Sequence, residues 1–434
     1  MSSSKSFISA TVIGLVARVV SIGIRFVSLP IILRVISAER YGLWLIITSI
    51  VGWLSMSDLG IPSALQNRLI NLLGLGEKKR ADALLSFGFK LLCGIGVGLF
   101  VLGILFLFVP VDSWFSVNAE LAIEFKIAFI LCLLTFALGL PTRVGGVLFN
   151  VHGYLSMPVF FELATSIFSF LMLLLAVYFK WDSIVILAIC SLVGLSVGSG
   201  LSTIIGMIKF DVKLTGHQYS SEDNKLLMSK GGLFFLTMIG ELLILQSDAF
   251  LVGTIKGAAI VPMFMIPMTL FINFIQLQNI WLRPLWPLLS SYKAKGLIME
   301  LKKHLVKTLL GSLLFAFLFG IGVILMGDLF IKFWSNNTTG MTIQMACGIA
   351  LYTLIACVDN ALASFLNAFD RIESRLGYTI FFGVMKLISG ALVLYYVVDG
   401  IEFLPLTYAL VMLTCSIPFA VITLVKEWKS WQLS

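Results

Sequence analysis

The strongest constraint on this chain is the length and near continuity of its apolar stretches. An α-helix of about 20 residues crosses a hydrocarbon layer about 30 Å thick, and a helix satisfies its own backbone hydrogen bonds in lipid. Such stretches lie at 7–36, 42–64, 81–109, 123–149, 158–179, 183–208, 231–255, 259–282, 305–331, 342–368, 377–398 and 403–425. The sequence therefore predicts an all-α integral membrane protein with about 12 transmembrane helices.

Composition excludes a soluble fold. The 434 residues are 59% hydrophobic and only 12% charged, whereas soluble domains are roughly 25% charged. The net charge of +8 comes from short basic runs between apolar segments, so membrane topology explains it better than nucleic-acid binding does. The six cysteines all fall in apolar segments without CxxC spacing, which predicts neither disulfides nor a metal site.

The most polar part of the chain lies near its middle, from Lys209 to Lys230. We expect an N-terminal lobe of six helices over 1–208, a cytoplasmic linker over 209–230 and a second six-helix lobe over 231–434. An asparagine ends both the fourth and the tenth segment, at Asn150 and Asn367. An even number of spans per lobe predicts parallel repeats, with the substrate path between them.

Loop charges predict the orientation, because Lys and Arg are retained on the cytoplasmic side. Basic residues cluster after the second, sixth and eighth segments, whereas the loops 110–122 and 399–402 contain none. We therefore expect a bacterial inner-membrane protein with both termini cytoplasmic. The exceptions to this pattern are Arg40, Lys180, Lys256 and Lys332.

Two arginines in the first segment, Arg18 and Arg25, are seven residues apart and share one helix face. A charge at the bilayer centre costs roughly 2.5 to 3.5 kcal/mol on insertion scales, so these side chains should avoid lipid. One interpretation is an ion pair with a neighbouring helix. The other, which the repetition on one face favours, is the wall of an anion-binding cavity.

Further polar residues inside the spans are candidate contacts for a sugar or a coupling ion. Some of these charges can pair with each other, and Lys90 and Arg143 are near enough to span ends to reach the interface. Four amides close together, Asn273, Gln276, Gln278 and Asn279, suit either a sugar-binding wall or hydrogen bonds between helices. The candidates are Asp58, Lys90, Glu162, Glu241, Asp248, Asn273, Gln276, Asp359 and Lys386.

The sequence contains no catalytic constellation. His152, His217 and His304 fall in predicted loops far apart, and no P-loop is present. No cofactor is predicted, and coupling to a proton or a sodium ion is left open.

A family resemblance lies in Tyr41-Gly42-Leu43-Trp44 and in the run from Ser57 to Arg68, SDLGIPSALQNR. These residues resemble the first two helices of bacterial polysaccharide transporters of the O-antigen flippase type, in the multidrug/oligosaccharidyl-lipid/polysaccharide exporter superfamily. The resemblance implies two six-helix bundles around a central cavity and alternating access. It also implies a substrate, an undecaprenyl-pyrophosphate-linked oligosaccharide moved from the cytoplasmic to the periplasmic leaflet. Polysaccharide polymerase machinery is an expected partner.

Arg18 and Arg25 suit that substrate, because guanidinium groups bind phosphate oxygens in a bidentate manner. The acids Glu241, Asp248 and Asp359 leave a second interpretation open, a cation-coupled multidrug exporter with an acidic cavity. A third, a membrane glycosyltransferase or polymerase, is disfavoured by the short outer loops. At matched depth, a bridge from Arg25 to Glu241 or Asp248 is expected, either to close the empty transporter or to hold the two lobes together permanently.

Overall fold

A computed structural model of the chain describes residues 2–54, 60–154, 156–212, 243–244, 246–368 and 372–432. The chain divides into two compact units, Met1–Phe235 and Leu236–Ser434. Every regular element in the described residues is a helix. Residues 213–230 of the predicted linker lie outside the described part, so the extent of the linker stays a prediction.

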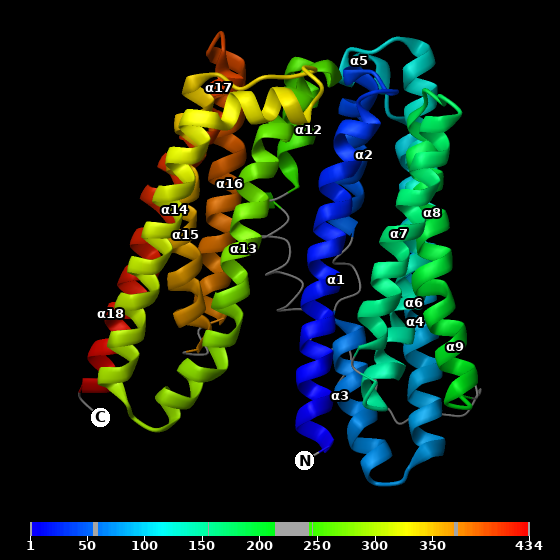
Figure 1. The fold of residues 1–434 in the computed structure, drawn as a ribbon, viewed down its shortest axis with the longest axis vertical. Coiled ribbons are helices and arrows are strands. Elements are labelled where there is room, and N and C mark those ends of the chain that lie inside the picture. Colours follow the sequence, from blue (N-terminus) through cyan, green and yellow to red (C-terminus); the bar gives the residue numbers. More distant parts are fainter. Residues whose placement is uncertain are drawn as a thin grey trace. The chain divides into compact units, whose positions relative to one another are not determined.

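In the first unit, the long helix α6 is the centre, packed by α4, α8, α9, α2 and α3 (Figure 1). Helix α1 packs mainly on α7. The helices are α1 (Ser2–Ile32), α2 (Ala38–Leu54), α3 (Ile61–Gly74), α4 (Lys78–Ile104), η1 (Leu105–Phe108), α5 (Val111–Phe115), α6 (Ala119–Val151), α7 (Met157–Tyr178), α8 (Ile184–Leu195), η2 (Ser196–Gly200) and α9 (Leu201–Lys209).

In the second unit, α15 has the corresponding central place, with α13, α14, α17 and α18 around it (Figure 1). Helix α16 packs on α17 and on α12. The helices are α12 (Ser247–Lys256), η3 (Ala258–Ile260), α13 (Val261–Ala294), α14 (Ile298–Trp334), α15 (Ile343–Ala368), α16 (Ile372–Tyr396), α17 (Gly400–Val411), η4 (Met412–Ser416) and α18 (Ile417–Gln432).

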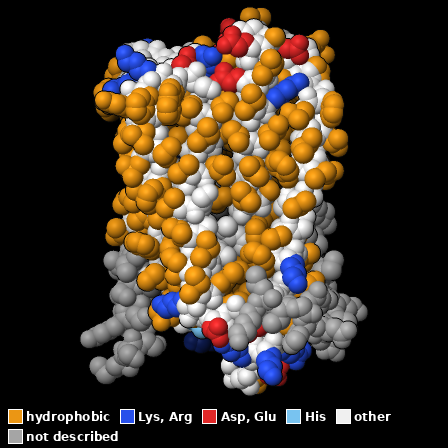
Figure 2. All heavy atoms as spheres, turned by 90° about the vertical axis from the view of Figure 1, so that its right-hand side faces the viewer, with side chains coloured by type: hydrophobic (Ala, Val, Ile, Leu, Met, Phe, Trp, Pro, Cys, Tyr) orange, Lys and Arg blue, Asp and Glu red, His pale blue; other side chains and the backbone are white. Residues whose placement is uncertain are grey.

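The described residues contain nine helices long and apolar enough to cross a membrane, and a shorter apolar helix over Val19–Ile32. These account for the predicted segments apart from the second, discussed below, and the seventh, whose first half lies outside the described part. Figure 2 shows hydrophobic side chains over the middle of one face, with charged side chains gathered towards its two ends. The chain is therefore a multi-pass membrane protein.

One face of α14 illustrates the contact with lipid. Leu314, Phe317, Leu318, Ile321 and Leu325 recur at helical spacing and are 40 to 72% exposed. In water such a row would be a large unpartnered apolar patch. In a membrane it is the surface that meets the acyl chains, so the exposure is what the predicted spans require.

The second predicted segment, 42–64, is divided in the structure. Helix α2 ends at Leu54, and α3 begins at Ile61 after Gly60, whose φ of 69° suits a residue without a side chain. Pro62 lies in the first turn of α3, where its missing N–H is not needed. The side chain of Gln66 in α3 accepts a hydrogen bond of 3.0 Å from Asn150 of α6. In the run from Ser57 to Arg68 that carries the family resemblance, Gly60, Ile61 and Pro62 therefore mark the start of a helix.

The last long helix of each unit carries the same interruption. Helix α8 runs for 12 residues before the five-residue π-helical turn η2, and α17 runs for 12 residues before the five-residue π-helical turn η4. Beside η2, a Cβ on Gly198 would lie 1.8 Å from Thr165 Oγ1 of α7, so only glycine fits this close approach. Shared π-helical turns support the prediction that the two halves are repeats.

Two basic exceptions to the predicted orientation carry their own counter-charges. Arg40 at the start of α2 pairs with Glu124 of α6 at 3.0 Å and with Asp182 before α8 at 2.8 Å. Lys332 of α14 pairs with Asp328 at 2.7 Å. The loop-charge rule counts Lys and Arg whatever their acidic neighbours, so both residues remain exceptions to the predicted orientation.

Candidate functional site

The arginine pair of the first segment lies on α1. Arg25 is exposed in its unit, and neighbouring apolar side chains are exposed as well, with Val19 at 65% and Val27 at 48%. Arg18 is on the same helix, but its side chain lies outside the described part. Asp58 and Glu241 also fall outside the described residues, so their predicted roles stay predictions.

Three other candidates are exposed within their units: Lys90 of α4, Glu162 of α7 and Gln276 of α13. Asn273 of α13 is half-buried. Within the described part of the chain, none of these four forms a side-chain hydrogen bond or ion pair with another candidate residue.

The first unit contains a pocket of about 440 Å³ between α2, α6, α8 and η2, with several polar side chains in a mostly apolar lining. Arg143 of α6 lines it together with Trp44 and Thr48 of α2, Thr135 of α6 and Ser191 of α8. The sequence suggested that Arg143 reaches a membrane interface, whereas the structure places it half-buried beside this pocket. Only tertiary packing could reveal this, because the pocket takes residues from three separate segments.

In the second unit, the amides of α13 tie helices together. Gln278 is fully buried and donates hydrogen bonds to Ser312 Oγ at 2.9 Å and to the Cys357 carbonyl at 2.8 Å. Asn360 donates to Gln278 Oε1 at 3.1 Å and to Asn279 Oδ1 at 2.9 Å. Of the two interpretations of these amides, hydrogen bonding between helices therefore holds for Gln278 and Asn279.

Asp359 of α15 is half-buried, and its Oδ1 accepts a hydrogen bond of 2.5 Å from Ser416 Oγ in η4. In the first unit, the Thr142 carbonyl of α6 accepts one of 2.7 Å from Thr203, just after η2. When Asn150 is aligned with Asn367, Thr142 corresponds in sequence to Asp359 and Arg143 corresponds to Asn360. At these positions the first unit has a basic residue where the second has an amide next to an acid.

The deepest charges of the second unit form a pair. Lys386 of α16 is 1% exposed and Asp248 of α12 is 6% exposed, and Lys386 Nζ lies 2.8 Å from Asp248 Oδ2. The sequence left open that some intramembrane charges pair with each other, and here two of the candidates do. The bridge expected between Arg25 and Asp248 would join the two units and stays a prediction; within its own unit, Asp248 pairs with Lys386.

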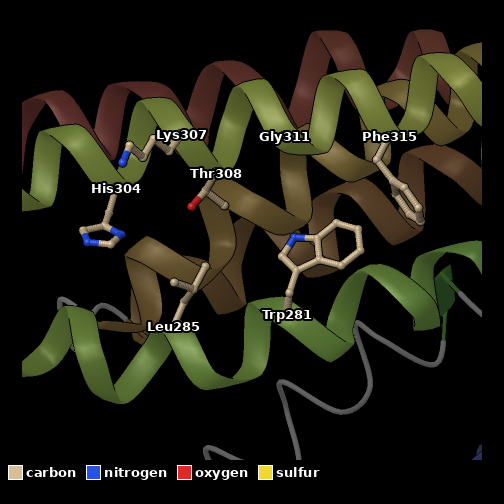
Figure 3. Close-up of a pocket in the computed structure, with 7 residues that line it drawn as sticks. All are labelled: Trp281, Leu285, His304, Lys307, Thr308, Gly311 and Phe315. Atoms are coloured by element: carbon tan, nitrogen blue, oxygen red, sulfur yellow. The ribbon is translucent and has the colours of Figure 1, made fainter.

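An amphipathic pocket of about 470 Å³ lies between α13 and α14. Its lining includes His304 and Lys307 at one end and Trp281 and Phe315 at the other (Figure 3). The Trp281 and Phe315 rings meet edge to face at 4.6 Å. The sequence placed His304 in a loop, and this is wrong, because α14 begins at Ile298, before the apolar segment itself.

With a cation at one end and aromatic rings at the other, such a pocket can bind a phosphate group and the hydrocarbon chain attached to it. No group of three or more His, Cys, Asp or Glu side chains suited to a metal ion occurs among the described residues.

No family model matches the chain. It is 20% identical over 390 residues to a Salmonella typhi protein named "Putative O-antigen transporter", and the match covers 82% of each chain. A second match, 40% identical over 53 residues and 12% of each chain, is to a Yersinia pseudotuberculosis protein named "Putative O-antigen export protein".

Solved structures show the fold. An inward-facing multidrug resistance MATE family transporter of the MOP superfamily superimposes with a TM-score of 0.81 at 12% identity, covering 94% of both chains. The lipid II flippase MurJ, in an inward closed conformation, gives 0.71 at 12% identity, covering 97% of this chain and 90% of its own. The predicted fold class and resemblance are confirmed: the chain has the two-lobe helical fold of the MOP superfamily. These relatives are transporters and flippases rather than enzymes.

Proposed function

We propose that this chain is a flippase that moves an undecaprenyl-pyrophosphate-linked oligosaccharide from the cytoplasmic to the periplasmic leaflet of the bacterial inner membrane. The observation that carries the proposal is the match over 82% of the chain to a protein named as an O-antigen transporter. The fold shared with a lipid II flippase supports it, because that protein is also named for a lipid cargo.

The pyrophosphate is the part of this substrate that most needs the protein, because its charges must leave water. Arg25 and Arg18 on α1 are the proposed ligands. A guanidinium held among exposed valines is costly in lipid and favourable beside a phosphate, since charge-assisted bidentate hydrogen bonds offset the desolvation. In this proposal the two units alternate access, and α1 carries the head group.

The sugar and the incoming lipid have separate candidate places. In the first unit, Arg143, Thr48, Thr135 and Ser191 line one pocket and offer donors and acceptors that match sugar hydroxyls. In the second unit, the pocket of Figure 3 offers Lys307 to a lipid phosphate. With α14 oriented as the loop charges predict, Lys307 lies towards the cytoplasmic leaflet, where the substrate is loaded.

Asp359 is the proposed coupling contact, because it is a half-buried acid of α15 whose Oδ1 accepts a hydrogen bond from Ser416 in η4. Protonation of a carboxylate removes an acceptor and gives a donor. That change would alter the hold of α15 on η4. A π-helical turn is a common place for such a local adjustment.

The test is complementation of a strain that lacks its own O-antigen flippase. Wild type should restore surface O-antigen, Arg25→Ala should abolish it, and Arg25→Lys should give a partial loss because lysine lacks the planar fork. Arg34→Ala is the matched control, an exposed cation just after α1. Restored O-antigen with Arg25→Ala at normal protein level would remove Arg25 from the mechanism.

The second candidate function is multidrug export, favoured by the MATE transporters with the same fold. At 12% identity that likeness concerns the fold alone. The same strains decide it: resistance to cationic dyes that depends on this chain, without restored O-antigen, would replace the proposed substrate with drugs.

A further inference from the structure

In the second unit, groups that can bind a cation surround the ammonium group of the buried Lys386. Lys386 Nζ donates to the Ile244 carbonyl and to Asp248 Oδ2, the latter at 2.8 Å. The same nitrogen lies 4.4 Å from the centre of the Tyr408 ring. A carbonyl, a carboxylate and an aromatic face, contributed around α12 and α17, thus converge on one positive charge from α16.

The surroundings offer more oxygen than the ammonium uses. Asp248 Oδ1 and Tyr408 Oη are buried and have no hydrogen-bond partner of good geometry in the described part of the chain. The Tyr408 hydroxyl and the Asp248 carboxylate are nevertheless near enough to each other for a hydrogen bond and an electrostatic interaction. Gly390, one turn after Lys386, leaves room for that hydroxyl, since a Cβ there would lie 2.9 Å from it.

Burial makes such a pair costly. Desolvating two charges offsets much of their attraction, so an apolar pair of similar volume is often as stable. Stability alone therefore does not explain a lysine and an aspartate in the interior of a membrane helix bundle. Carboxylate, carbonyl and hydroxyl oxygens are instead the ligands that hard metal cations prefer.

We propose that the Lys386 ammonium is a tethered cation that fills a monovalent-cation site formed by Asp248, the Ile244 carbonyl and Tyr408. Because the site is already occupied by a side chain, this lobe binds no sodium ion there. The assignment concerns the ion rather than the cargo, so it holds whether or not the proposed substrate is correct.

Removal of the ammonium should turn the site into one that binds a sodium ion. In Lys386→Ala the carboxylate loses its counter-charge and the space of the lysine stem opens. A sodium ion can then take the place of Nζ between the same oxygens. An ion pair with only a structural role predicts a different result: the variant is destabilised equally in all salts, because nothing around the carboxylate is arranged for a metal ion.

The experiment measures the melting temperature of the purified full-length protein in detergent, in sodium chloride and in choline chloride of equal ionic strength. Lys386→Ala should melt about 3 to 6 °C higher in sodium at roughly ten times its dissociation constant. Wild type should melt at the same temperature in both salts. Binding of radioactive sodium should show about one site more in the variant than in wild type.

Two controls isolate the site. Lys386→Ala combined with Asp248→Asn removes the carboxylate as well and should lose the sodium response. Lys332→Ala removes the ammonium of an exposed pair with Asp328, 2.7 Å long, and should create no sodium response. If Lys386→Ala does not fold, Lys386→Gln keeps most of the stem and adds an amide oxygen.

Sodium binding to wild type that Asp248→Asn removes would overturn the proposal, because the site would then not be filled by lysine. Equal melting of the single variants in both salts, without sodium binding, would overturn it too and leave a structural ion pair.

Discussion

The buried Lys386–Asp248 pair allows a quantitative prediction of how much stability the protein loses when one of the two charges is removed. The side chains are 2% and 8% exposed and the N···O distance is 2.8 Å. Breaking such a pair from one side leaves an uncompensated buried charge, which costs about 3 to 5 kcal/mol. For a unit of roughly 200 residues this lowers the melting temperature by about 6 to 20 °C.

The perturbations are Asp248→Asn, Lys386→Met and the double variant, all melted in sodium-free buffer. Each single variant should lose stability by that amount. The double variant should recover most of the loss, because neither charge remains to be desolvated. Lys332→Met is the exposed comparison, with side chains 51% and 41% exposed, and should cost at most about 1 kcal/mol.

A result in which Asp248→Asn is as mild as Lys332→Met would refute the reasoning, because the pair would then not be desolvated. A double variant that is less stable than both single variants would refute it as well. Comparison of the single and double variants therefore tests separately whether the pair is buried and whether the two side chains interact.

Three further outcomes are expected. Gln278→Leu should destabilise the second unit by about 2 kcal/mol in thermal melts, because it removes three hydrogen bonds between helices of roughly 0.6 kcal/mol each, whereas the exposed Gln276→Leu should be near neutral. Arg143→Ala should lower O-antigen transport at unchanged protein level, and normal transport would exclude the pocket of the first unit as a sugar site. Lys307→Ala should slow transport several-fold in the complementation assay, and Lys303→Ala, one turn earlier on α14, should not.

The spans could be predicted from the sequence because lipid imposes a simple rule on length and polarity. The segment 158–179 corresponds to α7 (Met157–Tyr178) and 342–368 to α15 (Ile343–Ala368). The division of segment 42–64 was not predicted, because hydropathy alone does not show where a helix stops inside an apolar stretch. Gly60 followed by Pro62 was the local signal that hydropathy overlooks.

The sequence predicted which residue types lie in the site, but not which of these side chains contact one another. The predicted spans placed Lys386 and Asp359 inside the membrane, but the distance from Lys386 to Asp248 depends on how α16 packs against α12. The π-helical turns η2 and η4 were not predicted either, because a change of backbone register leaves no simple periodicity in the sequence. His304 was placed in a loop because polarity was taken as the end of a helix that in fact extends beyond the apolar segment.

The most direct test of the central proposal is translocation by the purified chain in liposomes. Undecaprenyl-pyrophosphate-linked oligosaccharide would be loaded in one leaflet, and its arrival in the other followed with a membrane-impermeant enzyme that cleaves the exposed sugar. The account predicts that wild type moves the lipid-linked sugar across within the assay and that Arg25→Ala, equally well reconstituted, does not. Translocation at the rate of protein-free liposomes, with export of a cationic drug by the same preparation, would contradict it.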